Sequence, residues 1–484
     1  MPEEPARDPA ARGSEAEQAA GSGFAAGRDV LAPASIFKAY DIRGLYGSEM
    51  DETTAHAIGR AFARVLASLR GKAPSELRVG LGRDMRLTAP EMSEALRNGL
   101  VGEGASVLDA GMVATEMLYE LVGSRELDGG AMVTASHNPK PYTGVKLVRE
   151  GALALSGDAG IGDVQRMVEA GMDAAPGGGE VEEIDIWDQY HERAGTFIDS
   201  AKVTPMRVVV DGANGMAGPM VGPILEDLGL DLVPLYFKPD GEFPDHEPNP
   251  LLEENRKMII ERVRAEKADI GIAWDGDADR CFFIDEEGVF CDGDFVCALL
   301  ARAALAKEPG ATILYDPRSS RAVPDTVAAA GGRTALSRVG HAFFKARMRE
   351  ESAAFGGEVS GHYYFREFWC ADSGTIPALL MLELLSVEGR GLAELMSEFR
   401  SRYFISGEIN SEVDDQEAKM AEIEDRYSDG EISHLDGVSV DYPEWHFNVR
   451  PSNTEPLLRL NLESLGSRED MEKKRDEVLG LIRS

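Results

Sequence analysis

The chain has 484 residues, which is too long for one hydrophobic core because cores stop growing at roughly 250 to 300 residues, so we expect several domains. Its 43% hydrophobic and 28% charged residues are typical of a soluble protein, and no stretch approaches the roughly 18 apolar residues of a membrane span. A net charge of −35 disfavours nucleic-acid and membrane partners, so a phosphorylated substrate would have to be held by a local basic cluster.

Residues 1–35 are rich in Ala, Gly, Glu and Arg and show no hydrophobic periodicity, which predicts a disordered N-terminal tail. The tail lacks the apolar stretch of about 7 to 15 residues that a secretory signal needs, so we expect a cytoplasmic protein. The four cysteines form no C-x-x-C pair, which is typical of buried thiols in a reducing compartment.

From residue 36 onward, short apolar runs alternate with helical patterns such as residues 53–69. The apolar runs are 77–81, 131–133, 208–210, 268–273 and 312–315. This alternation predicts βαβ units with mostly parallel sheets, and its recurrence indicates one α/β module used more than once. The end of the chain differs. Hairpin-like strands followed by a charged helix predict an α+β domain there, and the strands are 437–442, 446–449 and 458–462.

The first motif is T-A-S-H-N-P at residues 134–139, directly after an apolar strand. Open α/β sheets bind ligands beyond the carboxyl ends of their strands, so a nucleophile would be expected in this loop. Ser136 offers a hydroxyl, while His137 and Lys146 could move protons or stabilise charge during a transfer. The same residues also fit a polar turn without function.

The second motif is D-G-D-A-D-R at residues 275–280. The carboxylates of Asp275, Asp277 and Asp279 alternate along a glycine-containing loop, which favours a hard cation such as Mg²⁺ or Ca²⁺. An EF-hand is excluded because glycine is not at position 6 of the loop. A solvated acidic turn is the alternative, but Arg280 indicates an anion nearby.

The third motif is G-E-V-S-G-H at residues 357–362. Glu358, Ser360 and His362 offer a carboxylate, a hydroxyl and an imidazole, a mixture of donors and acceptors that suits sugar hydroxyls. A glycine-rich turn without function fits the same letters.

The fourth motif is R-P-S-N-T-E-P at residues 450–456, between two expected strands of the last domain. The guanidinium of Arg450 matches a phosphate with two parallel hydrogen bonds, and short polar side chains follow it. These side chains are Ser452, Asn453 and Thr454. The motif predicts a phosphate site, with a capped hairpin turn as the alternative.

Taken in order, the four motifs resemble those of the α-D-phosphohexomutase superfamily, specifically its phosphomannomutase/phosphoglucomutase branch, over about residues 36–484. Further matching segments are F-K-A-Y-D-I-R-G at 37–44, D-G-A-N-G at 211–215 and G-E-F-P-D-H-E-P-N-P at 241–250. The resemblance implies a heart-shaped protein with three domains of shared mixed-sheet α/β topology and a C-terminal α+β domain around a central cleft. The expected domains are 36–182, 183–290, 291–402 and 403–484.

The same resemblance implies an intramolecular phosphotransferase that interconverts the 1-phosphate and 6-phosphate of mannose, glucose or both. Its cofactors would be Mg²⁺ and a hexose 1,6-bisphosphate activator, and its phosphosugar intermediate would exchange a phosphoryl group with a phosphoserine at Ser136. The protein would be a monomer or a homodimer.

Site roles follow from the resemblance residue by residue. The metal ligands would be the phosphorylated Ser136, Asp275, Asp277 and Asp279. Residues beside the reacting phosphate would be Tyr40, Arg43, His137, Lys146 and Arg280. The other phosphate would bind Arg450, Ser452, Asn453 and Thr454. Sugar contacts would come from Arg318, His341, Glu358, Ser360 and His362.

Two residues depart from the family pattern. Thr143 stands where asparagine is usual, and Glu116 follows Thr115 where proline is usual. Three other functions remain open at this point. They are a phosphoglucosamine mutase, a metal-dependent phosphatase and a non-catalytic sugar-phosphate sensor, of which the sensor would have no need of a nucleophile.

Overall fold

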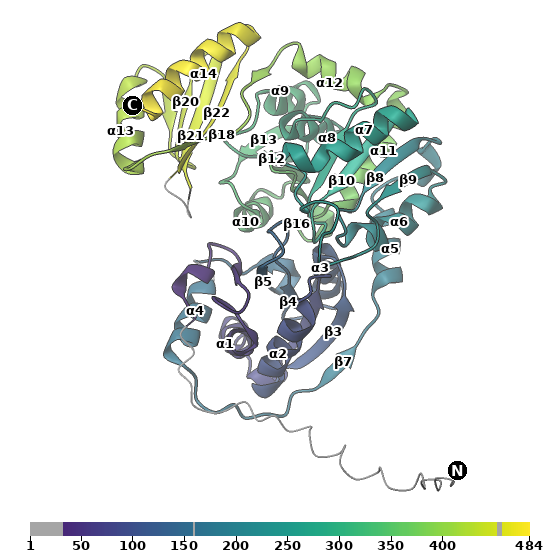
Figure 1. The fold of residues 1–484 in the computed structure, drawn as a ribbon, viewed down its shortest axis with the longest axis vertical. Helices are drawn as coiled ribbons and strands as arrows, with labels where there is room; N and C mark the ends of the chain where they lie inside the picture. Colours follow the sequence, from purple (N-terminus) through teal and green to yellow (C-terminus); the bar gives the residue numbers. More distant parts are fainter. Residues whose placement is uncertain (1–31, 158–159, 453–456) are drawn as a thin grey trace, which may run out of the picture.

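The structure is a computed structural model that describes residues 32–157, 160–452 and 457–484. In this part of the chain four β-sheets follow one another along an arc, from the first domain at the bottom of Figure 1 to the C-terminal domain at its upper left. Most of the expected N-terminal tail lies outside the described residues. The described chain begins with a 3₁₀ helix, η1 (Ala34–Ile36), which buries Ile36.

The first sheet has the strand order β1-β5-β4-β2-β3-β7, with β6 beside β5. Its strands are β1 (Ile42–Leu45), β2 (Arg78–Arg83), β3 (Ser106–Met112), β4 (Gly129–Val133), β5 (Tyr142–Arg149), β6 (Leu153–Ala154) and β7 (Val181–Glu183). Its helices are α1 (Glu52–Arg70), α2 (Ala89–Gly102), α3 (Thr115–Ser124) and α4 (Ile161–Ala170). The fully buried residues of β4 explain its uninterrupted apolar sequence.

The second sheet has the order β11-β10-β8-β9. Its strands are β8 (Arg207–Asp211), β9 (Asp231–Leu235), β10 (Ile270–Trp274) and β11 (Cys281–Ile284), with helices α5 (Trp187–Gly195), α6 (Ala217–Asp227) and α7 (Lys257–Glu266).

The third sheet has the order β13-β12-β14-β15-β16. Its strands are β12 (Thr312–Tyr315), β13 (Arg333–Leu336), β14 (Phe355–Gly357), β15 (Tyr363–Phe365) and β16 (Ala371–Asp372). Its helices are α8 (Gly293–Lys307), α9 (Ala322–Ala329), α10 (His341–Glu351), α11 (Thr375–Glu388) and α12 (Leu392–Arg400).

These three sheets share one topology. A central strand (β2, β8 or β12) pairs in parallel with the next two strands, one on each side. A fourth strand (β5, β11 or β15) then returns antiparallel beside the third. The loop between the third and fourth strands carries the serine, aspartate or Glu-Ser-His motif in turn. The prediction that one α/β module recurs is therefore confirmed, and the shared topology explains why the three motifs lie at equivalent sheet edges.

A buried aspartate also stands at the end of each central strand, as the last residue of β8 and as the residue directly after β2 and β12. Its carboxylate accepts a hydrogen bond from the backbone N–H two residues further on, which closes a local turn. The pairs are Asp84 with Arg86 at 2.9 Å, Asp211 with Ala213 at 2.8 Å and Asp316 with Arg318 at 2.8 Å.

The fourth sheet is antiparallel and has the order β17-β22-β21-β20-β19, with β18 also paired to β22. Its strands are β17 (Phe404–Ile405), β18 (Ile409–Glu412), β19 (Glu431–Ser433), β20 (Val438–Asp441), β21 (Trp445–Pro451) and β22 (Leu457–Ser464). Helices α13 (Gln416–Arg426) and α14 (Arg468–Ile482) complete the domain, which confirms the expected α+β end of the chain.

The hydrophobic cores show how the domains are joined. One cluster of buried side chains runs from α3 of the first domain through β8 and β10 of the second to α8 and α11 of the third. The C-terminal domain has a cluster of its own. It is held to the third domain by polar contacts such as those from the Arg321 guanidinium to Asp441 and to the carbonyls of Tyr442 and Pro443. Ile405 and Leu465 of the C-terminal domain also pack against the large cluster, so this interface is of mixed polar and apolar character.

All four cysteines are free and buried, as the sequence predicts. Among the helices of the described residues, none is both long and apolar enough to span a lipid bilayer.

Helices α1 and α2 pack unusually closely because glycines face each other across the contact. A Cβ on Gly99 would lie 2.2 Å from the carbonyl oxygen of His56, and one on Gly59 would lie 2.2 Å from that of Leu96. Real Cβ atoms do not approach backbone this closely, so both positions require glycine for the observed packing.

We therefore predict that Gly99→Ala lowers the free energy of unfolding by about 1 to 3 kcal/mol, because the helices must move apart. Gly102→Ala in the same helix is the matched control, since its Cβ would meet nothing closer than 3.8 Å. Urea titration followed by circular dichroism measures both. Equal midpoints for the two variants would contradict the tight packing of α1 on α2.

Candidate active site

Ser136 lies at the start of the loop between β4 and β5, and its hydroxyl points at the second domain. The Oγ atom donates a hydrogen bond of 2.8 Å to Asp275 Oδ2 and lies 3.2 Å from His137 Nδ1. The backbone of Ser136 is left-handed, with φ of +50°, a strained conformation for a residue with a side chain. Strain of this kind persists only where surrounding contacts enforce it.

Arg86 supplies those contacts. Its buried guanidinium donates hydrogen bonds to four backbone carbonyls of the serine loop. The distances are 2.8 Å to Ser136, 2.6 Å to Asn138 and 3.2 Å to both Pro139 and Tyr142. Arg86 was not predicted from the sequence. Its signal was the Asp-x-Arg pattern after the central strand, which also occurs at residues 316–318.

Asp275, Asp277 and Asp279 form a compact, fully buried triad. One carboxylate oxygen from each lies within 4.8 Å of the others. The Oδ1 atoms of Asp277 and Asp279 have no hydrogen-bond partner among the described residues. Burial raises the pKa of Asp275 to about 7, even though the Arg280 guanidinium opposes the shift. Unpaired buried carboxylate oxygens are the ligands that a divalent cation such as Mg²⁺ requires, so the triad fits a metal site.

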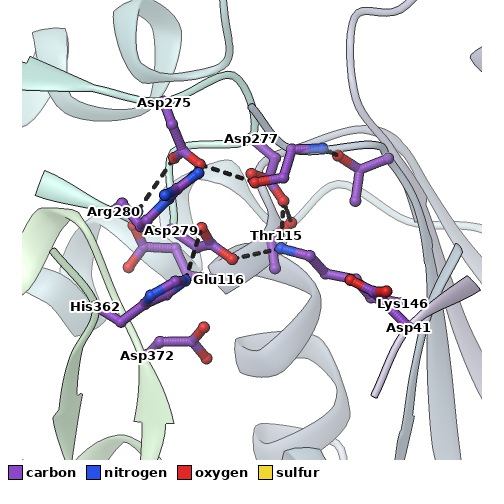
Figure 2. Close-up of polar contacts among 12 residues, drawn as sticks. Asp41, Thr115, Glu116, Lys146, Asp275, Asp277, Asp279, Arg280, His362 and Asp372 are labelled. Carbon is purple, nitrogen blue, oxygen red and sulfur yellow. Dashed lines mark hydrogen bonds and ion pairs between the residues drawn. The ribbon is translucent and has the colours of Figure 1, made fainter. Parts of the chain in front are cut away.

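Two cations balance the triad. Arg280 Nε contacts Asp275 Oδ2 at 2.9 Å, and Lys146 Nζ contacts Asp277 Oδ2 at 2.6 Å as well as Asp279. Burial alone would lower the pKa of Lys146, but the carboxylates of Asp277 and Asp279 raise it above its ordinary value. In Figure 2, Lys146 and His362 approach Asp279 from opposite sides.

Thr115 also contacts the aspartate triad. This contact was not predicted from the sequence. Its hydroxyl donates to Asp277 Oδ2 at 2.5 Å, and its backbone N–H donates to the Asp277 carbonyl at 3.2 Å (Figure 2). These bonds connect the start of α3 in the first domain to the aspartate loop of the second.

The remaining residues expected near the reacting phosphate surround the serine loop. Arg43 contacts Asn138 Oδ1 and Asp41 Oδ2, both at 2.6 Å. The Tyr40 ring meets His341 edge-on, with ring centroids 4.5 Å apart. Burial, together with the Arg280 and Arg43 guanidinium groups, lowers the pKa of His137 well below its ordinary value.

The Glu-Ser-His loop belongs to the third domain. Glu358 accepts hydrogen bonds from the Gly340 N–H at 2.6 Å and the Tyr364 hydroxyl at 2.9 Å, and burial raises its pKa to about 7. Ser360 Oγ lies 3.1 Å from His362 Nδ1. Both ring nitrogens of the buried His341 lack a hydrogen-bond partner within the described ranges.

A buried ion pair lies behind this loop. Lys345 Nζ is 2.5 Å from Asp372 Oδ1, and both side chains are almost completely excluded from solvent. Asp372 is also within reach of Asp279 and His362, since one ligand atom from each lies within 4.8 Å of the others. Lys345 follows His341 by one helical turn, but nothing in the sequence identified Asp372 as its partner.

The fourth motif belongs to a group of three arginines, Arg318, Arg450 and Arg459, which we call the distal arginine cluster. Arg318 makes two hydrogen bonds to Asp316, at 2.8 and 2.9 Å. Arg450 and Arg459 lie opposite each other on β21 and β22. Arg459 was not predicted from the sequence. Ser452 follows β21 and is buried, whereas the predicted residues Asn453 and Thr454 lie outside the described residues.

The structure thus brings most of the predicted residues into one region. Ser136, the aspartate triad and their cations form its centre. His362 of the Glu-Ser-His loop, which we call the sugar loop after its predicted role, faces this centre, with Nε2 3.8 Å from Asp279 Oδ1. Arg318 links the sugar loop to the distal arginine cluster, because its Nη2 lies 4.0 Å from Glu358 Oε1.

Four family descriptions match the chain in order. They are those of phosphoglucomutase/phosphomannomutase domains I, II and III and the C-terminal domain, over residues 34–171, 188–288, 292–403 and 408–481. The chain belongs to the phosphoglucomutase/phosphomannomutase family. The predicted family, four-domain fold class and enzyme class, an intramolecular phosphotransferase, are therefore confirmed.

Relatives support this membership over almost the whole chain. A phosphomannomutase from Salmonella montevideo is 44% identical over 462 residues, which cover 93% of this chain and 99% of that protein. A protein from Xanthomonas campestris described as phosphohexose mutases is 44% identical over 451 residues, covering 92% and 99%. A crystal structure of a phosphoglucomutase/phosphomannomutase family protein from Burkholderia thailandensis is 32% identical, with a TM-score of 0.82 and coverage of 93% and 97%.

Glu116, one of the two expected departures from the family pattern, joins the first domain to the third. Its carboxylate lies at the N-terminus of α11, where it accepts hydrogen bonds from the N–H and hydroxyl of Thr375, the Gly374 N–H and the Ser373 hydroxyl. A carboxylate is favoured at such a helix end. Burial nevertheless raises the pKa of Glu116 to about 7 from an ordinary value of 4.5, although the hydrogen bonds oppose the shift.

We predict that the stability of the wild type falls relative to Glu116→Gln as the pH rises from about 4.5 to about 7. In this window the folded carboxyl retains its proton and the unfolded one has lost it, so the stabilising contribution disappears as the pH passes the folded pKa. The difference should reach up to about 3 kcal/mol in the free energy of unfolding. Urea titrations across this range measure it, with the exposed Glu94→Gln as a control for the lost charge. Parallel curves for wild type and Glu116→Gln would contradict the shift.

Proposed function

We propose that this protein interconverts the 1-phosphate and 6-phosphate of mannose, glucose or both through a phosphoserine at Ser136 and a bound hexose 1,6-bisphosphate. The observation that carries the proposal is the Ser136 hydroxyl, which donates to Asp275 at 2.8 Å inside a buried triad of aspartates balanced by two cations. The relatives named phosphomannomutase and phosphohexose mutases support a hexose phosphate as the substrate. We place the enzyme in the cytoplasm as a monomer or homodimer, with the four domain boundaries expected from the sequence.

In the forward half-reaction, the phosphorus–Oγ bond of the phosphoserine breaks while a bond from phosphorus to the free sugar oxygen forms. The proton of that sugar hydroxyl passes to Ser136 Oγ, which becomes a hydroxyl again. Phosphoryl transfer of this type needs positioning and charge neutralisation more than covalent assistance. The 3.2 Å separation between His137 Nδ1 and Ser136 Oγ supports a role for His137 in moving that proton. Lys146, Arg43 and Arg280 supply positive charge around the transferring group.

Mg²⁺ would be held by Asp275, Asp277 and Asp279 together with the phosphate on Ser136, and it would neutralise the charge of the transferring phosphoryl group. The two unpaired buried oxygens of Asp277 and Asp279 support this assignment. Lys146 and Arg280 contact the carboxylates and hold them in place, so that a cation meets a prepared site.

The sugar would be held by the third domain and its other phosphate by the fourth. Glu358 is fixed by the Gly340 N–H and the Tyr364 hydroxyl, which leaves lone pairs on a rigid carboxylate for sugar hydroxyls. The unpaired ring nitrogens of His341 support a ligand contact there, while Ser360 and His362 offer further hydroxyl and imidazole groups. Arg450, together with Ser452, Asn453 and Thr454, would bind the phosphate that does not react. Arg318, expected from the sequence to contact the sugar, lies near Glu358 and also reaches Glu408 beside Arg450, so it would contribute to this phosphate site as well.

The bisphosphate must then turn end for end so that its other phosphate reaches Ser136. The same distal residues must therefore bind first one phosphate and then the other, and must also release each. This requirement distinguishes a mutase from a phosphatase, which needs no second phosphate site.

We predict turnover of mannose 1-phosphate and glucose 1-phosphate in a coupled assay with Mg²⁺ and a trace of the 1,6-bisphosphate. Ser136→Ala should lower this turnover by at least about three orders of magnitude, because it removes the group that carries the phosphoryl. Its fold should be retained, since one hydroxyl contributes little to stability. The exposed Ser200→Ala is the matched control.

Other outcomes of this assay would contradict the proposed mechanism or change the assigned function. Near-normal turnover by Ser136→Ala would remove the phosphoserine mechanism. Preference for glucosamine 1-phosphate would assign the protein to the amino-sugar branch. Release of inorganic phosphate without isomerisation would indicate a phosphatase, and no turnover on any substrate would indicate a sugar-phosphate binding protein.

We also predict that Arg450→Ala weakens glucose 6-phosphate binding by about 2 kcal/mol or more, through loss of a charge-assisted hydrogen bond. Isothermal titration calorimetry measures this directly. Arg426→Ala removes the same charge from an exposed position in the same domain and should leave affinity nearly unchanged. Equal affinities for the two variants would exclude Arg450 from phosphate binding.

A further inference from the structure

Glu408 lies among the three guanidinium groups of the distal arginine cluster. This residue directly precedes β18 in the fourth domain. Its Oε1 lies 3.3 Å from Arg459 Nη1, and its Oε2 lies 3.7 Å from Arg318 Nη1 and 3.8 Å from Arg450 Nη2. One carboxylate therefore faces two arginines of its own domain and one of the third domain.

Glu408 neutralises part of the positive charge of the cluster but makes few hydrogen bonds to its guanidinium groups. Only its contact with Arg459 meets hydrogen-bond geometry among the described residues, and the contacts with Arg318 and Arg450 are longer ion pairs. The buried Nε atoms of Arg450 and Arg459 also lack a hydrogen-bond partner in the described part of the chain. These guanidinium groups thus have unused donors, and a phosphate with three strong acceptor oxygens matches them better than one carboxylate does.

Glu408 can move out of the cluster into solvent. Its side chain is 29% exposed, close to the 28% of Arg459, whereas those of Arg318 and Arg450 are 5% and 13% exposed. Arg318 is held in place by its paired hydrogen bonds to Asp316. A swing of the Glu408 side chain into solvent would leave the arginines where they are and expose their donors to an incoming anion.

We propose that Glu408 is the resident counter-ion of the distal arginine cluster, and that a substrate phosphate binds by displacing it. This inference rests on the proposed function, because it assumes that the cluster binds the non-reacting phosphate. A competing carboxylate lowers the net affinity for every phosphate that enters. It also speeds release, because the arginines exchange one anion for another and are not left unpaired in a partly buried site. Release is what the reorientation of a bisphosphate requires.

The test compares Glu408→Gln with Glu412→Gln by isothermal titration calorimetry, using inorganic phosphate and glucose 6-phosphate as probes. Glu412 is exposed on β18, four residues further on, so this control removes the same charge from the same strand. Glu408→Gln should bind both probes at least about fivefold more tightly than the control. In the coupled assay, KM should fall for Glu408→Gln and kcat should fall with it, because release of phosphate from the cluster becomes slower.

Binding by Glu408→Gln that equals or is weaker than that of Glu412→Gln would overturn the proposal, and weaker binding would mean that Glu408 organises the arginines for the ligand. Arg450→Ala separates this failure from failure of the distal phosphate site. If Arg450→Ala weakens binding while Glu408→Gln does not tighten it, only the counter-ion role is wrong. If Arg450→Ala leaves binding unchanged, both assignments fall.

Discussion

Three aspartates crowded on one buried loop require buried cations beside them, and the rest of the site depends on this constraint. Lys146, 2.6 Å from Asp277 Oδ2 and also in contact with Asp279, and Arg280, 2.9 Å from Asp275 Oδ2, provide the compensation. Lys146 comes from the first domain and the triad from the second, so the ion pairs also hold these domains together. Ser136 is part of the same group of charged contacts, because its hydroxyl donates a hydrogen bond to Asp275, the aspartate that Arg280 contacts.

The polar contacts continue from the triad into the third domain. His362 of the Glu-Ser-His loop faces Asp279, while the buried Asp372 is paired with Lys345. Glu116 adds a separate connection from the first domain to the start of α11. Breaking one partner of such a buried pair costs far more than a surface contact does. The relative placement of the three α/β domains is therefore coupled to the chemistry at their junction, whereas the C-terminal domain, with a core of its own, is not bound by the same constraint.

Much of this arrangement could be predicted from the sequence because its signals are local. An apolar strand followed at once by a serine or aspartate motif places that motif at a sheet edge, and the structure has these loops where the pattern indicates. Glu116 was noticed as a departure, but its partners lie more than 250 residues away, so its place at a helix end could not be read from the chain. The same holds for Arg86 and for the Lys345–Asp372 pair, which become meaningful only when distant segments pack. Arg459 was missed because its role depends on cross-strand register with Arg450.

The shared topology of the first three sheets has a consequence for how such an enzyme can change. The serine, aspartate and Glu-Ser-His loops, which we propose hold the phosphoryl group, the metal and the sugar, each occupy the same connection in a separate copy of one module. Each connection is a hairpin whose ends are fixed by its own pair of strands, so its length and composition can vary without altering the register of the other two. Substrate preference can thus diverge by replacement of the third hairpin alone, while the phosphoryl-transfer machinery is inherited unchanged. Because each recurring module carries a different loop, substrate specificity and reaction chemistry can change independently of each other.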